Sequence, residues 1–230
     1  MMQGMLLVDK PKSWTSFDVV NYVRRQVAEA AGIKPRNIKV GHIGTLDPLA
    51  TGLLVLLVGS KYTRRAESLT KLDKVYQVEC RLGETTDSFD AETEKHFVSD
   101  HQPTNDEVLS VLNSFIGKSL QTPPIYSAIK VNGKRAYKLA RSGKTAGLAP
   151  RPIEIYNLEL ISYNYPLIVF RARVSSGTYI RSLVSDIGVK LNTGAYMSDL
   201  RRLTIGDFSL DNATPVDGLD AEKISQCLID

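Results

Sequence analysis

The stretch GHIGTLDPLATGLLVLLVG, from Gly41 to Gly59, joins a crowded turn to a wholly apolar run. Its first twelve residues hold three glycines, one proline and a single acid, Asp47. Because the ring of Pro48 disfavours the helical region for the residue before it, Asp47 is expected in an extended or turn conformation. The apolar run predicts a buried strand. A carboxylate on a loop held by such a strand is a candidate catalytic group, although Asp-Pro is also an ordinary way to start a turn.

The residues before this stretch predict a strand and a helix. MMQGMLLVDKPK, at residues 1–12, indicates a short first strand that ends at Pro11. A helix is expected from Ser16, as its capping residue, to Gly32, which stops it. The side chains expected along one side of this helix are Phe17, Val20, Val23, Val27 and Ala31.

The residues after the stretch mix strand and helix patterns. KVYQVECRL (74–82) alternates strictly, which predicts a half-buried strand with Tyr76, Val78, Cys80 and Leu82 on one face. TNDE (104–107) is a capping box, and the helix that it begins is expected to end at Gly117. Further strands are expected at 153–163 and 167–174, with a turn at Pro166 between them, and another helix at 178–192. This irregular order predicts an α+β fold with a central, largely antiparallel sheet and flanking helices.

Composition limits the class of protein. The 230 residues are 43% hydrophobic and 23% charged, which is typical of a globular chain built as one large domain or two tightly joined lobes. No uncharged apolar run approaches the ~18 residues that cross a bilayer. The N-terminus lacks the features of a signal peptide, and Cys80 and Cys227 show no ligand or paired spacing. These features predict a cytoplasmic protein with free thiols and no membrane association.

The basic residues are unevenly distributed along a chain of formal net charge +4. Residues 108–153 contain no acid and eight bases, which are Lys118, Lys130, Lys134, Arg135, Lys138, Arg141, Lys144 and Arg151. Within them, SAIKVNGKRAYKLARSG (127–143) predicts a strand, an Asn132-Gly133 turn and a short basic helix. A polyanionic partner and a merely solvated basic face fit this charge about equally well.

Other chemistries lack their motifs. GHIG fits neither the dinucleotide-binding nor the phosphate-loop pattern, and no GxSxG sequence occurs. His42 and Asp47 alone do not make a metal site, and His96 and His101 lie in an unrelated polar segment. The sequence therefore favours carboxylate chemistry without a cofactor or metal.

The loop GHIGTLDPLATGLL resembles the signature loop of the TruB family of bacterial tRNA pseudouridine-55 synthases. LLVDKPKSWTSFDVV, KVYQVECRLGETTDSFDAE, PPIYSAIKVNGKRAYKLAR, RPIEIYNLEL, SSGTYIRSLVSDIG and LRRLTIGDF resemble further family blocks in the same order. Small departures are Trp14, Ile43 and Ser88, where Gly, Thr and Thr are usual. The chain stops at Asp230, where members commonly continue into an RNA-binding PUA domain. The resemblance thus implies one catalytic domain at residues 1–230, lacking the PUA domain, with a basic RNA-contacting arm within 108–153.

The implied activity is isomerisation of uridine 55 in the T-loop of tRNA to pseudouridine, by a monomer that needs no cofactor and no metal. The base is flipped out, its N-glycosidic bond breaks, the uracil turns, and C5 rejoins C1′. Asp47 is the expected essential carboxylate. It attacks C1′ or C6, or assists loss of uracil, and the sequence does not choose between these routes.

The resemblance also implies roles for other residues. His42 is expected to wedge into the T-loop in place of the flipped base, and Tyr76 to stack on the uracil. Arg181, placed off the buried stripe of its helix, is expected to pair with Asp47 and keep it ionised. The remaining expected substrate- or RNA-binding positions are Tyr179, Leu200, Lys10, Ser127, Lys130, Lys134 and Arg135.

Two other function classes stay open at this point. A non-catalytic RNA-binding module with the same fold is expected to have lost Asp47, and the acid is present. A carboxylate hydrolase that acts on nucleosides or sugars needs a second acid about 5–10 Å from the first. No motif nominates that acid, and Asp87 and Asp90 are the remaining candidates.

Overall fold

The computed structural model describes residues 2–127, 129–131, 133–136 and 147–230. The chain forms two compact units, one made of Met1–Tyr76 with Leu200–Asp230 and the other made of Gln77–Asp199. The first unit therefore combines the two ends of the sequence, and the second contains the middle. Two strands, β4 (Lys74–Leu82) and β12 (Ala195–Ile205), begin in one unit and end in the other.

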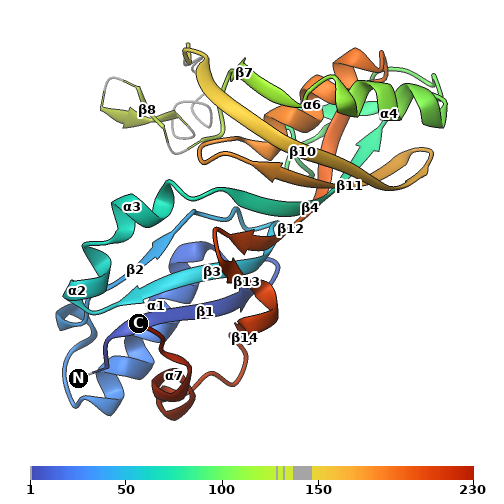
Figure 1. Cartoon of the computed structure of the whole chain (residues 1–230). Coiled ribbons are helices and arrows are strands. Elements are labelled where there is room, and N and C mark those ends of the chain that lie inside the picture. Colours follow the sequence, from blue (N-terminus) through green and yellow to red (C-terminus); the bar gives the residue numbers. More distant parts are fainter. Residues whose placement is uncertain (1, 128, 132, 137–146) are drawn as a thin grey trace. The chain divides into compact units, whose positions relative to one another are not determined.

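The first unit contains the loop that carries Asp47. Its N-terminal elements are β1 (Gly4–Lys10), α1 (Ser16–Ala30), η1 (Pro35–Asn37), β2 (Val40–Ile43), β3 (Thr51–Val58), α2 (Ser60–Thr63) and α3 (Ala66–Thr70). Its C-terminal elements after β12 are β13 (Phe208–Ser209), η2 (Leu210–Asn212), β14 (Thr214–Pro215) and α7 (Ala221–Cys227). Figure 1 shows α1 and α7 beside β1 and β3.

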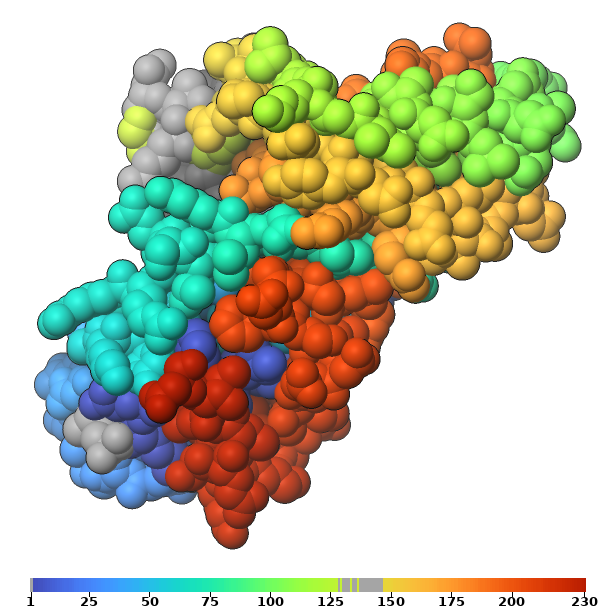
Figure 2. Space-filling model, in the orientation of Figure 1, coloured from blue at the N-terminus to red at the C-terminus, as the bar shows by residue number. Residues whose placement is uncertain are grey.

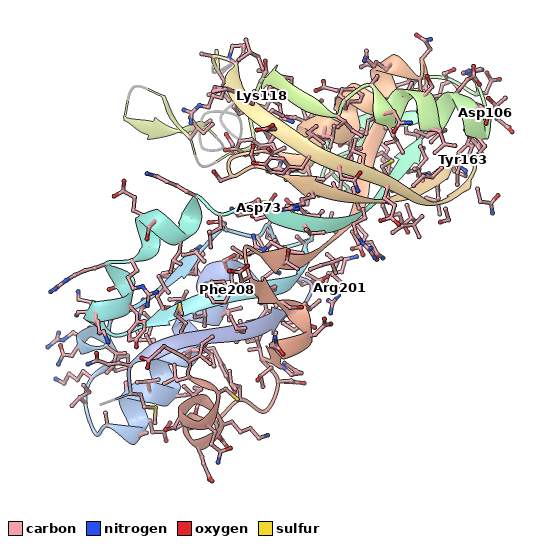
Figure 3. All side chains as sticks on the ribbon, viewed as in Figure 1. Asp73, Asp106, Lys118, Tyr163, Arg201 and Phe208 are labelled. Atoms are coloured by element: carbon pink, nitrogen blue, oxygen red, sulfur yellow. The ribbon has the colours of Figure 1, made fainter. Side chains whose placement is uncertain are left out.

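The described residues of the second unit include a long hairpin and two helices. Its elements are β5 (Glu84–Thr86), β6 (Lys95–Phe97), α4 (Asn105–Asn113), β7 (Gly117–Gln121), β8 (Lys130–Val131), β9 (Lys134–Arg135), β10 (Arg151–Asn164), β11 (Leu167–Val174) and α6 (Ile180–Lys190). Helix α4 packs against β10 and α6. The Tyr163 hydroxyl of β10 donates to the Pro103 carbonyl (2.6 Å), just before α4; Figure 3 labels Tyr163 and, in the first turn of α4, Asp106.

The main sheet has the strand order β14-β1-β3-β12-β4-β11-β10-β7, with β2 paired to β3 and β13 to β12. The pairs β1–β3, β2–β3, β10–β11, β7–β10 and β12–β13 are antiparallel, whereas β1–β14 and β3–β12 are parallel. The predicted α+β class with a largely antiparallel sheet is confirmed.

Strand β3 is buried on both faces, which explains its uninterrupted apolar sequence. Leu54, Leu56 and Val58 pack with one face of β1 and with the apolar side of α1. Leu53, Val55 and Leu57 pack on the opposite side, with Tyr62 of α2 and with Ile205. A strand sandwiched in this way needs apolar residues at every position rather than at alternate ones. The prediction of a buried strand after the loop is confirmed.

The two ends of the sequence close the first unit. The last residues pair with the first strand through Met5 and Ile229, and β14 pairs with β1. Figure 2 shows red atoms of the C-terminal segment next to the blue atoms of the N-terminal strand.

Helix α1 differs from the prediction in its cap and in its buried side. The N-cap is Thr15, which forms a capping box with Asp18, and Ser16 is the first helical residue. Phe17 is 58% exposed, and the buried apolar residues are Val19, Val20, Val23, Val27 and Ala28. The prediction was wrong at the cap because the Ser16 hydroxyl is engaged elsewhere, with the backbone of Leu46.

Other local predictions are confirmed with small differences at element ends. Tyr76, Val78, Cys80 and Leu82 are all buried on β4, and Thr104 and Glu107 form the capping box of α4. Helix α4 ends at Asn113 rather than at Gly117 because Ser114 caps it, which leaves Ile116 exposed. The predicted Pro166 turn joins β10 and β11. The predicted basic helix falls largely on 137–146, outside the described residues.

No helix within the described ranges combines the length and the apolarity that a membrane crossing requires.

Candidate active site

The loop before β3 fixes the backbone on both sides of Asp47. The Leu46 N–H donates to Ser16 Oγ (2.8 Å), and this hydroxyl donates to the Leu46 carbonyl (3.0 Å). On the other side, the Pro48 carbonyl accepts from the Ser13 N–H (2.8 Å). Because both flanking residues are tied to the segment around the start of α1, the half-buried Asp47 has little conformational freedom.

Lys10 is a buried cation at this loop. Its Nζ donates to the carbonyls of Pro11 (2.8 Å), Trp14 (2.6 Å) and Pro48 (3.4 Å). Burial lowers the pKa of Lys10 to about 8, while the charge of Asp47 acts in the opposite direction and favours the ammonium form. The structure therefore places Lys10 close enough to Asp47 for their charges to interact, as expected of a residue that supports the site.

Arg202 is a second buried cation, and it anchors both ends of the loop. Its Nε donates to the Leu53 carbonyl (2.7 Å), and its Nη2 donates to the Gly44 carbonyl (2.7 Å). It also shares a hydrogen bond with Tyr76, and burial lowers its pKa. Gly44 has φ +64°, and a Cβ there comes to 3.0 Å from Arg202 Nη1. A glycine is required here both by the backbone conformation and by the approach of the guanidinium.

Lys74 is the third buried cation and lies at the start of β4. Its Nζ donates to the carbonyls of Thr70 (3.1 Å) and Leu72 (2.5 Å). Burial, aided by the charge of Arg202, lowers the pKa of Lys74 to about 8. Its Cε lies 3.3 Å from the position of a Cβ on Gly44, so Lys74 and Arg202 crowd the same turn.

His42 lies half-buried on β2, at the entrance to the loop. Its Nε2 is 3.0 Å from the Thr45 hydroxyl. Burial, together with the charge of Arg202, lowers the pKa of His42, so the ring is neutral at neutral pH. A neutral imidazole is suited to contact with bases as well as to packing within the loop.

Tyr76 and Leu200 are the remaining expected site residues in the first unit. Both are buried, each with 7% of its surface exposed. Leu200 belongs to β12, and its carbonyl accepts from the Thr51 hydroxyl (3.4 Å) just after the loop. In the next position, Arg201 holds Asp9 with two bonds (2.7 and 3.1 Å); Figure 3 labels this arginine on β12. The first unit thus gathers six expected or newly found side chains around one glycine-rich loop: Lys10, His42, Asp47, Lys74, Tyr76 and Arg202.

Arg181 lies in the second unit, where it is buried rather than exposed. Its Nη1 lies 3.4 Å from Asp90 Oδ2, and it donates to the carbonyls of Ser88 (3.1 Å) and Tyr126 (2.8 Å). The expectation that Arg181 lies off the buried stripe was wrong, because Asp90 compensates its charge inside the unit. The pairing of Arg181 with Asp47 links residues of different units and stays a prediction.

Tyr179 and Ser127 also belong to the second unit. Tyr179 caps α6, and its backbone exchanges two hydrogen bonds with the Gln121 side chain (2.8 and 3.0 Å). Ser127 is buried, and its hydroxyl has no hydrogen-bond partner in the part of the chain that the structure describes.

The predicted strand is found at Lys130–Val131, but a second strand, Lys134–Arg135, follows the turn where the sequence predicted the basic helix; this pair of strands is called the basic hairpin below. Lys130 pairs with Arg135 and Val131 with Lys134, which gives the antiparallel pair β8–β9. Gly133 has φ +80°, as expected of the second turn residue. The side chains of Lys130, Lys134 and Arg135, and all of Lys138, lie outside the described residues.

The sequence matches two family models over most of its length. Residues 30–180 match the TruB family pseudouridylate synthase (N terminal domain), and residues 181–226 match the tRNA pseudouridylate synthase B C-terminal domain. The chain belongs to the TruB family of pseudouridylate synthases. The resemblance seen in the sequence is confirmed.

Curated relatives and solved structures agree with this assignment. The chain is 44% identical over 228 residues to the tRNA pseudouridine synthase B of Clostridium novyi (strain NT), covering 99% of this chain and 76% of that protein. It is 43% identical to the tRNA pseudouridine synthase B of Phocaeicola vulgatus, covering 97% of this chain and 96% of that protein. The structure is similar to that of a chain in a Cbf5-Nop10-Gar1 complex (TM-score 0.71, 27% identity), covering 96% of this chain and 58% of that one. The chain therefore spans less than two thirds of this structural neighbour.

Sequence reasoning did not find Arg202 or Lys74. The sequence did contain a signal for Arg202. It stands two positions after Leu200, so the two side chains lie on the same face of a strand. A charged residue on the buried face of a strand indicates either a structural residue whose hydrogen bonds are satisfied inside the protein or a residue of a functional site. No group of three His, Cys, Asp or Glu within the described ranges could hold a metal ion.

Proposed function

We propose that this chain converts uridine 55 in the T-loop of tRNA to pseudouridine and that Asp47 is the catalytic carboxylate. Membership of the TruB family and the names of the curated relatives support the reaction class. The observation that carries the assignment of Asp47 is its position on a doubly anchored loop, where its charge interacts with the buried Lys10 ammonium. Such pre-organisation is typical of groups that stabilise a charged transition state.

The reaction is an isomerisation, so its atoms balance within the substrate. The N1–C1′ bond breaks, a C5–C1′ bond forms, the proton on C5 is lost, and N1 ends protonated. Asp47 attacks C1′ or C6, or assists the departure of uracil from the sugar. In each route the ionised carboxylate is the working form, and the ammonium of Lys10 stabilises that form electrostatically.

The neighbouring side chains have roles that follow from base flipping. The target nucleoside leaves the stack of the loop before its sugar reaches the half-buried carboxylate of Asp47. Neutral His42 occupies the position vacated by the base, and Tyr76 stacks on the flipped uracil. Arg202 holds Tyr76 and the loop together, and so it positions the stacking ring relative to Asp47.

The proposal includes the substrate and the setting. The substrate is the T-arm of tRNA, bound by a monomer in the cytoplasm. The basic hairpin around Lys130, Lys134 and Arg135 supplies contacts to the RNA backbone. The charge of the acid-free span from 108 to 153 supports this role.

The test is to incubate the purified chain with an unmodified tRNA transcript and to map pseudouridine along it. A matched transcript carries cytidine in place of uridine 55. We expect one pseudouridine, at position 55, and none in the matched transcript. A product at another position, or no product with any tRNA, contradicts the proposal.

A further inference from the structure

The first unit has a second polar feature, which shares strand β2 with the candidate active site. A hollow of about 350 Å³ is lined by Arg24, Arg36, Ile38, Lys39, Val40, Gly41 and Thr63, and is called the basic hollow below. Three of these side chains are cationic and none is acidic. The lining residues come from α1, η1, the segment before β2, β2 itself and α2; α1 packs against η1 and β2, and α2 packs against β2.

Arg24 is held in a fixed orientation at the hollow. Its Nη1 donates to Asn21 Oδ1 (2.8 Å), its Nη2 donates to the Val40 carbonyl (3.2 Å), and its guanidinium lies 5.8 Å from the centre of the Phe17 ring. These contacts account for two of the five N–H donors that an arginine carries. A guanidinium fixed in this way loses little side-chain entropy when it binds a phosphate. The exposed ring of Phe17 contacts Arg24 and does not pack in the core.

Further cations flank the lining residue Thr63 in the sequence. Lys61 belongs to α2, and Arg64 and Arg65 follow it; the charged groups of Lys61 and Arg65 lie over the Tyr62 ring (5.2 and 5.7 Å). Within the described residues, none of these bases, nor Arg24, Arg36 or Lys39, is within 4.0 Å of a carboxylate oxygen. Uncompensated charge spread over several elements fits a run of phosphates better than a single small anion.

Strand β2 links the hollow to the loop that carries Asp47. The hollow's lining residues Val40 and Gly41 begin β2, and His42 follows directly on the same strand. Since a strand advances about 3.3 Å per residue, the hollow lies within about 10 Å of the entrance to the loop.

We propose that the basic hollow is a binding site for the phosphodiester backbone of RNA, separate from the nucleoside site at Asp47. It holds the strand that flanks the target nucleoside, with Arg24 as a fixed phosphate ligand and with Arg36 and Lys39 as the charged rim. The choice of RNA as the ligand rests on the proposed function.

The test compares two double variants with the same change in charge. R36Q/K39Q removes two cations of the hollow, both exposed and neither engaged in a described hydrogen bond of its side chain. R25Q/K34Q removes two exposed cations of the same region that do not line the hollow. The dissociation constant of each protein for a T-arm RNA hairpin is measured at several salt concentrations, together with the single-turnover rate at saturating RNA.

The expected result separates the variants by salt dependence. Each phosphate contact contributes about 0.7–0.9 to the slope of log K against log salt, so R36Q/K39Q should lower the slope by about 1.4–1.8 and weaken binding several-fold. R25Q/K34Q should differ little from the wild type, and the single-turnover rate of both should be unchanged. Equal slopes for the two variants overturn the inference. Binding is measured without turnover. A wild-type protein that makes no pseudouridine therefore refutes the proposed function, while the comparison of the two salt slopes still tests the basic hollow.

Discussion

The substitution Gly52→Ala tests how tightly the loop that carries Asp47 is built into the sheet. Gly52 has φ +96° and lies in β3 opposite Lys10 of β1 and Arg202 of β12. A Cβ at this position lies 2.3 Å from the carbonyl oxygen and 2.7 Å from the backbone nitrogen of Arg202. Real Cβ atoms do not approach closer than 3.0 Å, so β12 has to move away from β3.

The expected loss of stability has two parts, backbone strain at residue 52 and weakened hydrogen bonds around Arg202. The left-handed backbone conformation costs an L-residue about 1–2 kcal/mol. Displacing a buried backbone segment weakens hydrogen bonds worth about 0.5–1.5 kcal/mol each, among them those that Arg202 makes. We expect the free energy of unfolding to fall by about 3–5 kcal/mol, which is at the upper end for a single substitution.

The matched control is Gly32→Ala. Gly32 also has a positive φ (+65°), but nothing lies within 4 Å of a Cβ built there, so only the backbone strain of about 1–2 kcal/mol is expected. Urea unfolding followed by the fluorescence of Trp14, the one tryptophan in the chain, reports on the unit that contains both glycines. If Gly52→Ala costs no more than Gly32→Ala, the close approach of β12 to β3 is refuted.

Three further predictions concern charges. Arg181→Lys should lower the free energy of unfolding by about 1–3 kcal/mol, because an ammonium cannot make the branched contacts with Asp90, Ser88 and Tyr126; a wild-type urea midpoint contradicts this. The free energy of unfolding should rise between about pH 8 and 10.5, since the folded protein releases the Lys74 proton while the unfolded chain still holds it. Lys10, whose pKa is also lowered to about 8, contributes in the same direction, so Lys74→Met should reduce that rise in urea titrations without abolishing it; an unchanged pH dependence contradicts a lowered pKa of Lys74. Replacing Lys134 and Arg135 with Gln should lower the slope of log K against log salt for RNA binding. An unchanged slope would indicate that the basic hairpin is exposed to solvent and does not contact RNA.

Features set by neighbouring residues could be predicted from the sequence. The alternation in β4, the capping box of α4, the turn at Pro166 and the buried strand β3 each depend on patterns only a few residues long. The Asp-Pro turn within a glycine-rich loop likewise identified the candidate carboxylate before any contact was known.

Features set by contacts between distant residues could not be predicted in this way. Thr15 and Ser16 are both suitable caps, and only the bonds from Ser16 to Leu46, thirty residues later, decide between them. Arg202 and Lys74 were missed because lysine and arginine are ordinarily exposed, and their burial depends on carbonyl groups of other segments.

The measurement that tests the central claim most directly is single-turnover pseudouridine formation in tRNA by Asp47→Asn. Asp207→Asn is the matched control, since Asp207 is exposed at a turn of the same unit and changes the charge equally. We predict that Asp47→Asn lowers the rate by at least about 10³-fold, as loss of a nucleophile does, while tRNA binding stays within a few-fold of the wild type. Asp207→Asn should keep the wild-type rate. An Asp47→Asn protein that forms pseudouridine at a rate close to that of the control contradicts the assignment of Asp47 as the catalytic carboxylate.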